Sequence, residues 1–369
     1  MPGHSGLQAM RSKSEAWCRP PQGGQPWLSQ SPVMTRRTLN NFDFLRLAAA
    51  TAVLLSHQFA LQGLPEPVTV IGSWGGIGVL VFFAISGYLV AGSWQRDPHA
   101  GRFLWRRALR LWPGLVVAVG LVTFCLGPWV TQLSWRDYFH DAGTWRYLRL
   151  LGLWEFQSDL PGVFTHNAHP GSANGSLWTL PLEARCYGVL ALLGSLSVWR
   201  RPRLMWAFWA ALTSWFFFIW SVGYEDMLRM KVQMGVVFAT GAMLQWFEAW
   251  WLAHRYRLPC VLGLLMAAGL GLGQLDMMVT LGIAISVVWL GTLSTPVLRQ
   301  CGRFGDFSYG LYIYAFPVQQ TFFWLGGASL SLGIGSLVVM TITLALAAVS
   351  WHCIEAPALR LKPVHSRTA

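Results

Sequence analysis

Residues 42–62, FDFLRLAAATAVLLSHQFALQ, form an apolar stretch with only three ionisable side chains, Asp43, Arg46 and His57. An α-helix rises 1.5 Å per residue, so about 20 residues cross the roughly 30 Å hydrocarbon core of a bilayer. The stretch therefore predicts a transmembrane helix. Ionisable groups are costly inside a membrane, so each one within such a helix is a candidate functional residue.

Similar stretches recur along the chain of 369 residues, of which 54% are hydrophobic and only 11% are charged. Soluble domains contain about 25% charged residues, so this composition excludes a soluble globular protein. The expected fold class is all-α, a polytopic integral membrane helical bundle of about ten transmembrane helices with both termini cytoplasmic. The expected spans are 42–62, 72–94, 111–130, 177–198, 204–222, 232–252, 259–275, 277–295, 308–326 and 331–353.

The basic residues, which give the chain a net charge of +12, predict its orientation. If the N-terminus lies inside, most of them fall on the cytoplasmic side, in agreement with the positive-inside rule. This bias accounts for the charge without a nucleic-acid partner, and it predicts a multi-pass protein of the cytoplasmic (inner) membrane. The basic residues that would lie outside are Arg136, Arg146, Arg149, Arg229 and Lys231.

The rest of the chain divides around the spans. Residues 1–33 are polar and are expected to be a disordered extension or a misassigned start, with Met34 as the alternative first residue. Residues 34–361 would form the membrane domain, and residues 362–369 a short cytoplasmic tail. One long outer loop is expected at about 131–176, where it could form a lid or a binding surface. The histidines of this loop lack a third ligand nearby, so no metal is expected.

Arg46 and His57 are the most informative pair. They are eleven residues apart, so they lie within about 20° of one face of the helix and are separated by roughly 16 Å along it. Neutral imidazole is the usual general base near neutral pH, which makes His57 the catalytic candidate. The alternative is that Arg46 extends to the inner headgroups and that His57 is satisfied by a hydrogen bond in the core. Asp43 and Asp306 are expected to pair with nearby arginines.

Arg107 and Arg110 lie at the cytoplasmic entry of the third span. If this segment is helical they share a face, and guanidinium groups match phosphate oxygens. The alternative is ordinary positive-inside anchoring.

Asn174, Trp178, Glu183 and Tyr187 open the fourth span from the outer side. Glu183 and Tyr187 lie one turn apart on the same face. At 1.5 Å per residue, Glu183 would lie about 9 Å deep and His57 about 8 Å deep, so the two are expected to share one outward-facing cavity. The alternative is a structural Glu183 that pairs with a neighbouring arginine.

In combination, these features resemble the acyltransferase-3 family of integral membrane acyltransferases, and the match runs from Phe42 to Leu361. The resemblance implies transfer of an acyl group, most often acetyl, from cytoplasmic acyl-CoA to a hydroxyl of a glycan or related small molecule. Where the family often has a further histidine, this chain has Ala315. The motifs are Phe42-Asp-Phe-Leu-Arg46 with His57, Gly78 to Leu89, Arg107-x-x-Arg110-x-x-Pro113, Ser176-Leu-Trp178-Thr-Leu-Pro-Leu-Glu183, Ser308-Tyr309-Gly-Leu-Tyr312, and Glu355-Ala-Pro357.

The resemblance also implies roles for the candidate residues. A CoA phosphate group would be held by Arg107, Arg110 and Arg46, and the pantetheine arm would then reach the depth of His57. His57 would be the general base on the acceptor hydroxyl or would carry the acyl group covalently, and Glu183 would orient the acceptor or the imidazole. The acceptor would contact Asn174, Trp178 and Tyr187.

Two other classes of function remain open at this point. A secondary transporter would also carry charged residues at the membrane midplane, but the repeats and paired broken helices typical of transporters are not found. A non-catalytic component of a cell-envelope glycan assembly system would have no need for Arg46, His57 and the Arg107 motif to occur together. The acceptor, the acyl chain length and the oligomeric state are left open.

Overall fold

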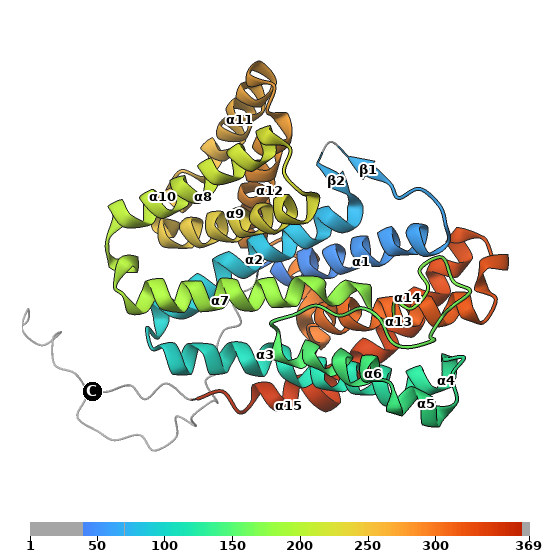
Figure 1. Cartoon of the computed structure of the whole chain (residues 1–369). Helices are drawn as coiled ribbons and strands as arrows, with labels where there is room; N and C mark the ends of the chain where they lie inside the picture. The colour runs from blue at the N-terminus through green and yellow to red at the C-terminus, as the bar shows by residue number, and fades with distance from the viewer. Residues whose placement is uncertain (1–39, 70, 364–369) are drawn as a thin grey trace, which may run out of the picture. The chain divides into compact units, whose positions relative to one another are not determined.

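A computed structural model describes residues 40–69 and 71–363, and within them a helix coincides with each of the ten expected spans (Figure 1). The expectations for residues 1–33, the alternative start at Met34 and most of the tail lie outside the described residues. The ten helices are α1 (Phe42–Leu61), α2 (Trp74–Arg96), α3 (Ala100–Leu121), α7 (Leu180–Ser195), α8 (Pro202–Val222), α9 (Asp226–Trp246), α11 (Leu258–Leu272), α12 (Leu275–Thr292), α13 (Ser308–Trp324) and α14 (Leu332–Ser350).

Seven helical stretches in the described part of the chain are long and apolar enough to cross a membrane. Helices α7, α9 and α13 are not among them, since α7 and α13 have only 16 and 17 residues and α9 begins with several charged residues. The protein is therefore an all-α, multi-pass membrane protein. The ten crossings and the cytoplasmic termini remain predictions.

Shorter elements join or extend these helices. The hairpin of β1 (Val68–Thr69) and β2 (Gly72–Ser73) connects α1 to α2. The short helices are α4 (Gly127–Val130), α5 (Trp135–His140), α6 (Ala142–Tyr147), α10 (Glu248–Ala253) and α15 (Ala356–Leu359). The 3₁₀ helices are η2 (Leu148–Gly152), η3 (Gly175–Thr179), η4 (Val198–Arg200), η5 (Arg255–Arg257), η6 (Leu298–Phe304) and η7 (Gly327–Ser329), and the π-helical turns are η1 (Val122–Leu126) and η8 (Trp351–Glu355).

Helix α3 begins eleven residues before the expected start of its span, at Ala100 instead of residue 111. Asp97, just before the helix, accepts hydrogen bonds from Arg102 at 2.5 Å and from Arg106 at 2.6 Å. The hydrogen bond from Arg102 is the main reason why the pKa of the Asp97 carboxyl lies well below its ordinary value, and Arg106 adds to the effect. Arg102 and Arg106, which were expected in a loop, thus belong to the first turns of α3, because Asp97 anchors both of them.

Helices α2 and α9 pack closely through glycines. A Cβ atom on Gly87 would lie 2.0 Å from the carbonyl oxygen of Phe238, and one on Gly241 would lie 2.4 Å from the carbonyl oxygen of Ala84. Real Cβ atoms do not approach backbone oxygens so closely, so the two helix backbones meet only because these positions lack side chains.

Helix α13 is buried along most of its length and contacts α1, α3 and α14. Its side chains bind backbone carbonyls of neighbouring elements: Tyr309 donates to Leu111 at 2.7 Å, and Gln319 donates to Leu54 at 2.8 Å. These bonds fix α13 between the helices that carry the candidate arginines and His57.

The segment expected as a loop at 131–176 is folded and packs against helices α3 and α13. It contains α5, α6 and η2, and its Tyr138 and Tyr147 side chains are fully buried. The indole nitrogen of Trp112 on α3 donates to the carbonyl of Leu151 at 2.9 Å. At the end of this segment, η3 replaces the first turn of the expected fourth span, so α7 begins at Leu180.

Candidate functional site

One cavity gathers most of the predicted site residues between α1, α2, α3, α7 and α13. Three arginines on two helices, Arg46 on α1 and Arg107 and Arg110 on α3, line it together with Glu183 and Tyr187 on α7. The sequence placed the arginines at the inner ends of two different spans, and the fold brings them to one space. The remaining polar lining residues are Ser86, Thr179, Ser308, Tyr309 and Tyr312.

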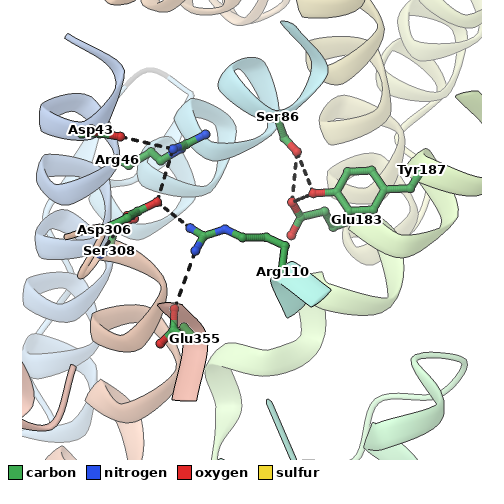
Figure 2. A network of polar contacts seen from close by, with 9 residues as sticks. All are labelled: Asp43, Arg46, Ser86, Arg110, Glu183, Tyr187, Asp306, Ser308 and Glu355. Carbon is green, nitrogen blue, oxygen red and sulfur yellow. Dashed lines mark hydrogen bonds and ion pairs between the residues drawn. The ribbon is translucent and has the colours of Figure 1, made fainter. Parts of the chain in front are cut away.

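Asp306 connects two of the arginines (Figure 2). Its Oδ2 atom lies 2.6 Å from Arg110 and 3.3 Å from Arg46, and Arg46 also lies 3.5 Å from Asp43. Arg110 has a second acid, Glu355, at 3.6 Å. The pairing expected for Asp43 and Asp306 is therefore confirmed.

The ionised form of Asp306 is strongly favoured. Burial alone would raise the pKa of this carboxyl, but the charges of Arg110 and Arg46 and the hydrogen bonds from Ser308 outweigh burial and lower the pKa to about 2. The carboxylate is thus charged throughout the neutral pH range and fixes both guanidinium groups at the cavity wall.

Arg107 differs from its two neighbours. It lines the same cavity, but its buried Nε atom has no hydrogen-bond partner among the described residues. Because a buried donor without a partner is unfavourable, this guanidinium is suited to an anion that enters the cavity.

Glu183 and Tyr187 lie on one face of α7, as their spacing predicted, and both contact Ser86 on α2 (Figure 2). The Ser86 hydroxyl donates to Glu183 at 3.0 Å and lies 3.0 Å from the Tyr187 hydroxyl, and Tyr187 also donates to Glu183. The carboxylate thus belongs to a hydrogen-bonded trio on the cavity wall. Ser86 falls within the family motif from Gly78 to Leu89, but the sequence assigned it no role because its partners lie on α7.

His57 does not line this cavity, so the expectation that His57 and Glu183 share one cavity is wrong. Its Nδ1 atom lies 3.4 Å from the Ser176 hydroxyl of η3, and its ring stands edge-on to Phe316 with centroids 5.3 Å apart. The depth estimate failed because His57 lies beside Ser176, before the start of α7, whereas Glu183 is seven residues further along the chain.

Three residues lie between His57 and the cavity. The hydroxyl of Tyr312 donates to the Ser176 carbonyl at 2.6 Å and lies 2.6 Å from the Thr179 hydroxyl. Tyr312 and Thr179 line the cavity, while the Ser176 side chain faces His57. We call these three residues the Tyr312 partition.

The structure also separates the three residues expected to contact the acceptor. Tyr187 lines the cavity, but Asn174 and Trp178 do not. The fully buried Asn174 amide donates to the Ile313 carbonyl at 2.9 Å and accepts from the Ser176 backbone at 3.2 Å. Asn174 therefore fixes the start of η3 against α13, and Trp178 is partly buried against the core. The contact of these two residues with the acceptor stays a prediction.

Glu355 is a further residue whose role the sequence did not reveal. It lies in η8, is 2% exposed, and accepts from Ser350 at 2.9 Å while it faces Arg110. The closing Glu355-Ala-Pro357 motif was visible in the sequence, but its partner is on α3, far away in the chain. As for metals, no group of three or more possible ligands occurs in residues 40–69 and 71–363.

Comparison with known proteins agrees with the family resemblance found in the sequence. The acyltransferase-3 model, described as an acyltransferase domain, matches residues 39–351. An O-acetyl transferase of Shigella phage Sf6 is 33% identical over 333 residues, which cover 86% of this chain and 95% of the relative. Nodulation protein 10 of Rhizobium leguminosarum bv. viciae is 31% identical over 363 residues, which cover 88% of this chain and 94% of the relative.

A putative membrane-bound transacylase, BcsY, of Komagataeibacter xylinus is 27% identical over 248 residues, which cover 65% of this chain and 58% of the relative. No solved structure shows significant similarity to the chain.

Proposed function

We propose that this chain, which belongs to the acyltransferase-3 family of membrane O-acyltransferases, uses cytoplasmic acyl-CoA as its donor. The acyl group would be transferred to a hydroxyl of a glycan or related small molecule. Acetyl is the acyl group we expect, since one similar protein is named an O-acetyl transferase. Membership of an enzyme family argues against the transporter and the non-catalytic component.

One observation carries the proposal: helix α1 extends from the arginine cavity to the imidazole. Arg46 lies in the cavity with Arg107 and Arg110, and His57 lies eleven residues further along the same helix. At 1.5 Å per residue this separation is roughly 16 Å, comparable with the pantetheine arm of CoA. Phosphates held by the arginines would therefore direct the thioester toward His57.

The charges around the cavity favour an anionic donor. Arg46 and Arg110 are fixed by Asp306, and Arg107 offers its guanidinium to the ligand. Burial above all, and then repulsion from Arg107, Arg110 and Arg106, lowers the pKa of Lys362 to about 8. A phosphate group would relieve this repulsion.

In the reaction we propose, His57 accepts the proton of the acceptor hydroxyl. The oxygen forms a bond to the carbonyl carbon of the thioester, the C–S bond breaks, and the CoA thiolate leaves and takes a proton. The trio of Glu183, Ser86 and Tyr187 shapes the donor cavity. Of the two roles expected for Glu183, to orient the acceptor or to orient the imidazole, the second does not suit its position away from His57.

The test is CoA thiol release from acetyl-CoA by the purified protein in lipid nanodiscs. Wild-type protein should release thiol, and His57→Ala should reduce the rate by about 10²- to 10⁴-fold while CoA still binds, because His57 lies outside the arginine cavity. His352→Ala, which removes an exposed imidazole of η8, is the matched control and should keep the wild-type rate. Full activity in a folded His57→Ala variant would refute the assignment of His57.

The acceptor is identified by a second measurement. Mass spectrometry of cell-envelope glycans and secreted metabolites, with and without the gene, should reveal a lost acyl mass. If no glycan and no hydroxylated metabolite loses an acyl group, the proposed acceptor class is incorrect.

A further inference from the structure

The acid that stands beside His57 is Glu66, in the link between α1 and the β hairpin. Its Oε2 atom accepts a hydrogen bond from the Ser56 hydroxyl at 2.5 Å, and Ser56 directly precedes His57 on α1. Ser56 is fully buried and Glu66 is partly buried. The carboxylate is therefore anchored to the turn of helix that carries the imidazole.

The backbone around Glu66 fixes the carboxylate in this position. Pro65 and Pro67 flank the residue, and a proline ring restricts φ to about −65°. The Pro67 carbonyl accepts a hydrogen bond from the Trp74 backbone at 3.1 Å, which ties the link to the start of α2. Gly75 also packs on Ser56, since a Cβ there would lie 3.0 Å from its hydroxyl oxygen. Helix α2 therefore closes over the contact between Ser56 and Glu66.

Three elements present polar or charged groups to the imidazole. Glu66 from the link and His169 from the 131–176 segment interact with it electrostatically, and Ser176 from η3 contacts its Nδ1 atom. Glu66 is the acid of this set. Glu183, by contrast, is bound to Ser86 and Tyr187 on the far side of the Tyr312 partition.

We infer that Glu66 is a positioning residue for His57: its carboxylate, anchored by Ser56, stabilises the imidazolium that forms when His57 accepts the proton of the acceptor hydroxyl. This inference rests on the proposed function. In the tautomer whose Nδ1–H donates to the Ser176 hydroxyl oxygen, Nε2 is the atom that takes the proton. The positive charge created by this step then interacts with a carboxylate anchored on the adjacent residue, and this attraction stabilises the imidazolium.

The experiment measures thiol release with acetyl-CoA as donor and water as nucleophile, for wild type, Glu66→Gln, Glu66→Asp and His57→Ala. Glutamine has the length of glutamate and its carbonyl still accepts the Ser56 hydrogen bond, so a purely structural role would tolerate this change. We expect Glu66→Gln to lower kcat by on the order of tenfold or more with KM for acetyl-CoA nearly unchanged. Glu155→Gln, an exposed acid of the 131–176 segment, is the matched control and should resemble wild type.

The pH profile gives an independent readout. His57 must be neutral to accept a proton, and the Glu66 charge favours the protonated imidazole, so loss of the charge should displace the acidic limb of kcat to lower pH. Glu66→Asp keeps the charge, so it should keep the position of the limb and recover part of kcat. This variant also serves if Glu66→Gln does not fold.

The outcomes separate the inference from the proposed function. If His57→Ala loses activity while Glu66→Gln keeps the wild-type kcat and an unshifted acidic limb of the pH profile, the role of Glu66 is overturned. The role of His57 then remains intact. Wild-type activity in His57→Ala would overturn both. A Glu66→Asp variant as inactive as His57→Ala, with altered KM, would show a structural role only.

Discussion

At the scale of single residues, Arg107 and Arg110 share a helix face but have different partners. Arg107→Ala removes a guanidinium whose Nε has no partner, so we expect CoA binding to weaken by about 1.5–3 kcal/mol with little loss of stability. Arg110→Ala leaves Glu355 without its cation and Asp306 with Arg46 alone, so we expect a loss of roughly 2–3 kcal/mol of stability.

Calorimetric titration with CoA and thermal unfolding of the two variants measure these effects separately. Arg200→Ala, an arginine outside the cavity lining, is the control for both. Equal losses of binding and stability in Arg107→Ala and Arg110→Ala would show that the two arginines have the same role.

The sequence predicted which residue types would meet at this site better than it predicted their partners. Arg46, Arg107 and Arg110 were found because a cation within or beside an apolar stretch is conspicuous. Ser86 lay in a quoted motif but received no role, and Glu66 was not found, since an acid in a connecting link is ordinary. Their importance depends on contacts between segments that are far apart in the chain or separated by a turn, which a local pattern cannot reveal.

At the scale of helices, the glycine contact between α2 and α9 makes a prediction about stability. Gly241→Ala places a methyl group against the Ala84 carbonyl, so we expect a loss of about 1–3 kcal/mol. Gly235 lies on the same helix with open space around it, so Gly235→Ala should be neutral or slightly stabilising because alanine favours helix.

Thermal unfolding of both variants in nanodiscs compares them directly. If Gly241→Ala unfolds at the same temperature as Gly235→Ala, the helices do not depend on this close approach.

The positions of the long helices could be predicted because about 20 apolar residues in a row have few alternatives in a bilayer. The start of α3 and the fold of residues 131–176 could not. Asp97 recruits Arg102 and Arg106 into a helix, and Trp112 binds Leu151 across 39 residues of chain. Both depend on specific polar contacts that hydropathy does not measure.

At the scale of the whole molecule, the charge bias predicts a topology that can be measured. Cysteines introduced at Arg201 and Glu155, in a background with the native cysteines replaced by serine, should be labelled by an impermeant maleimide from opposite sides of the membrane. Arg201 should be protected in intact cells and Glu155 should react. Reaction of both positions from one side would refute the ten-span topology.

The Tyr312 partition has a consequence for how the enzyme conserves its donor. Tyr312 joins Thr179 and the Ser176 carbonyl through two hydrogen bonds of 2.6 Å, so a closed polar seam stands between the arginine cavity and the imidazole. Under the proposed function, the pantetheine arm has to pass this hydrogen-bonded contact to bring the thioester from the arginine side to His57. Breakdown of acyl-CoA by water is then expected to depend on how readily Tyr312, Thr179 and Ser176 let the arm through.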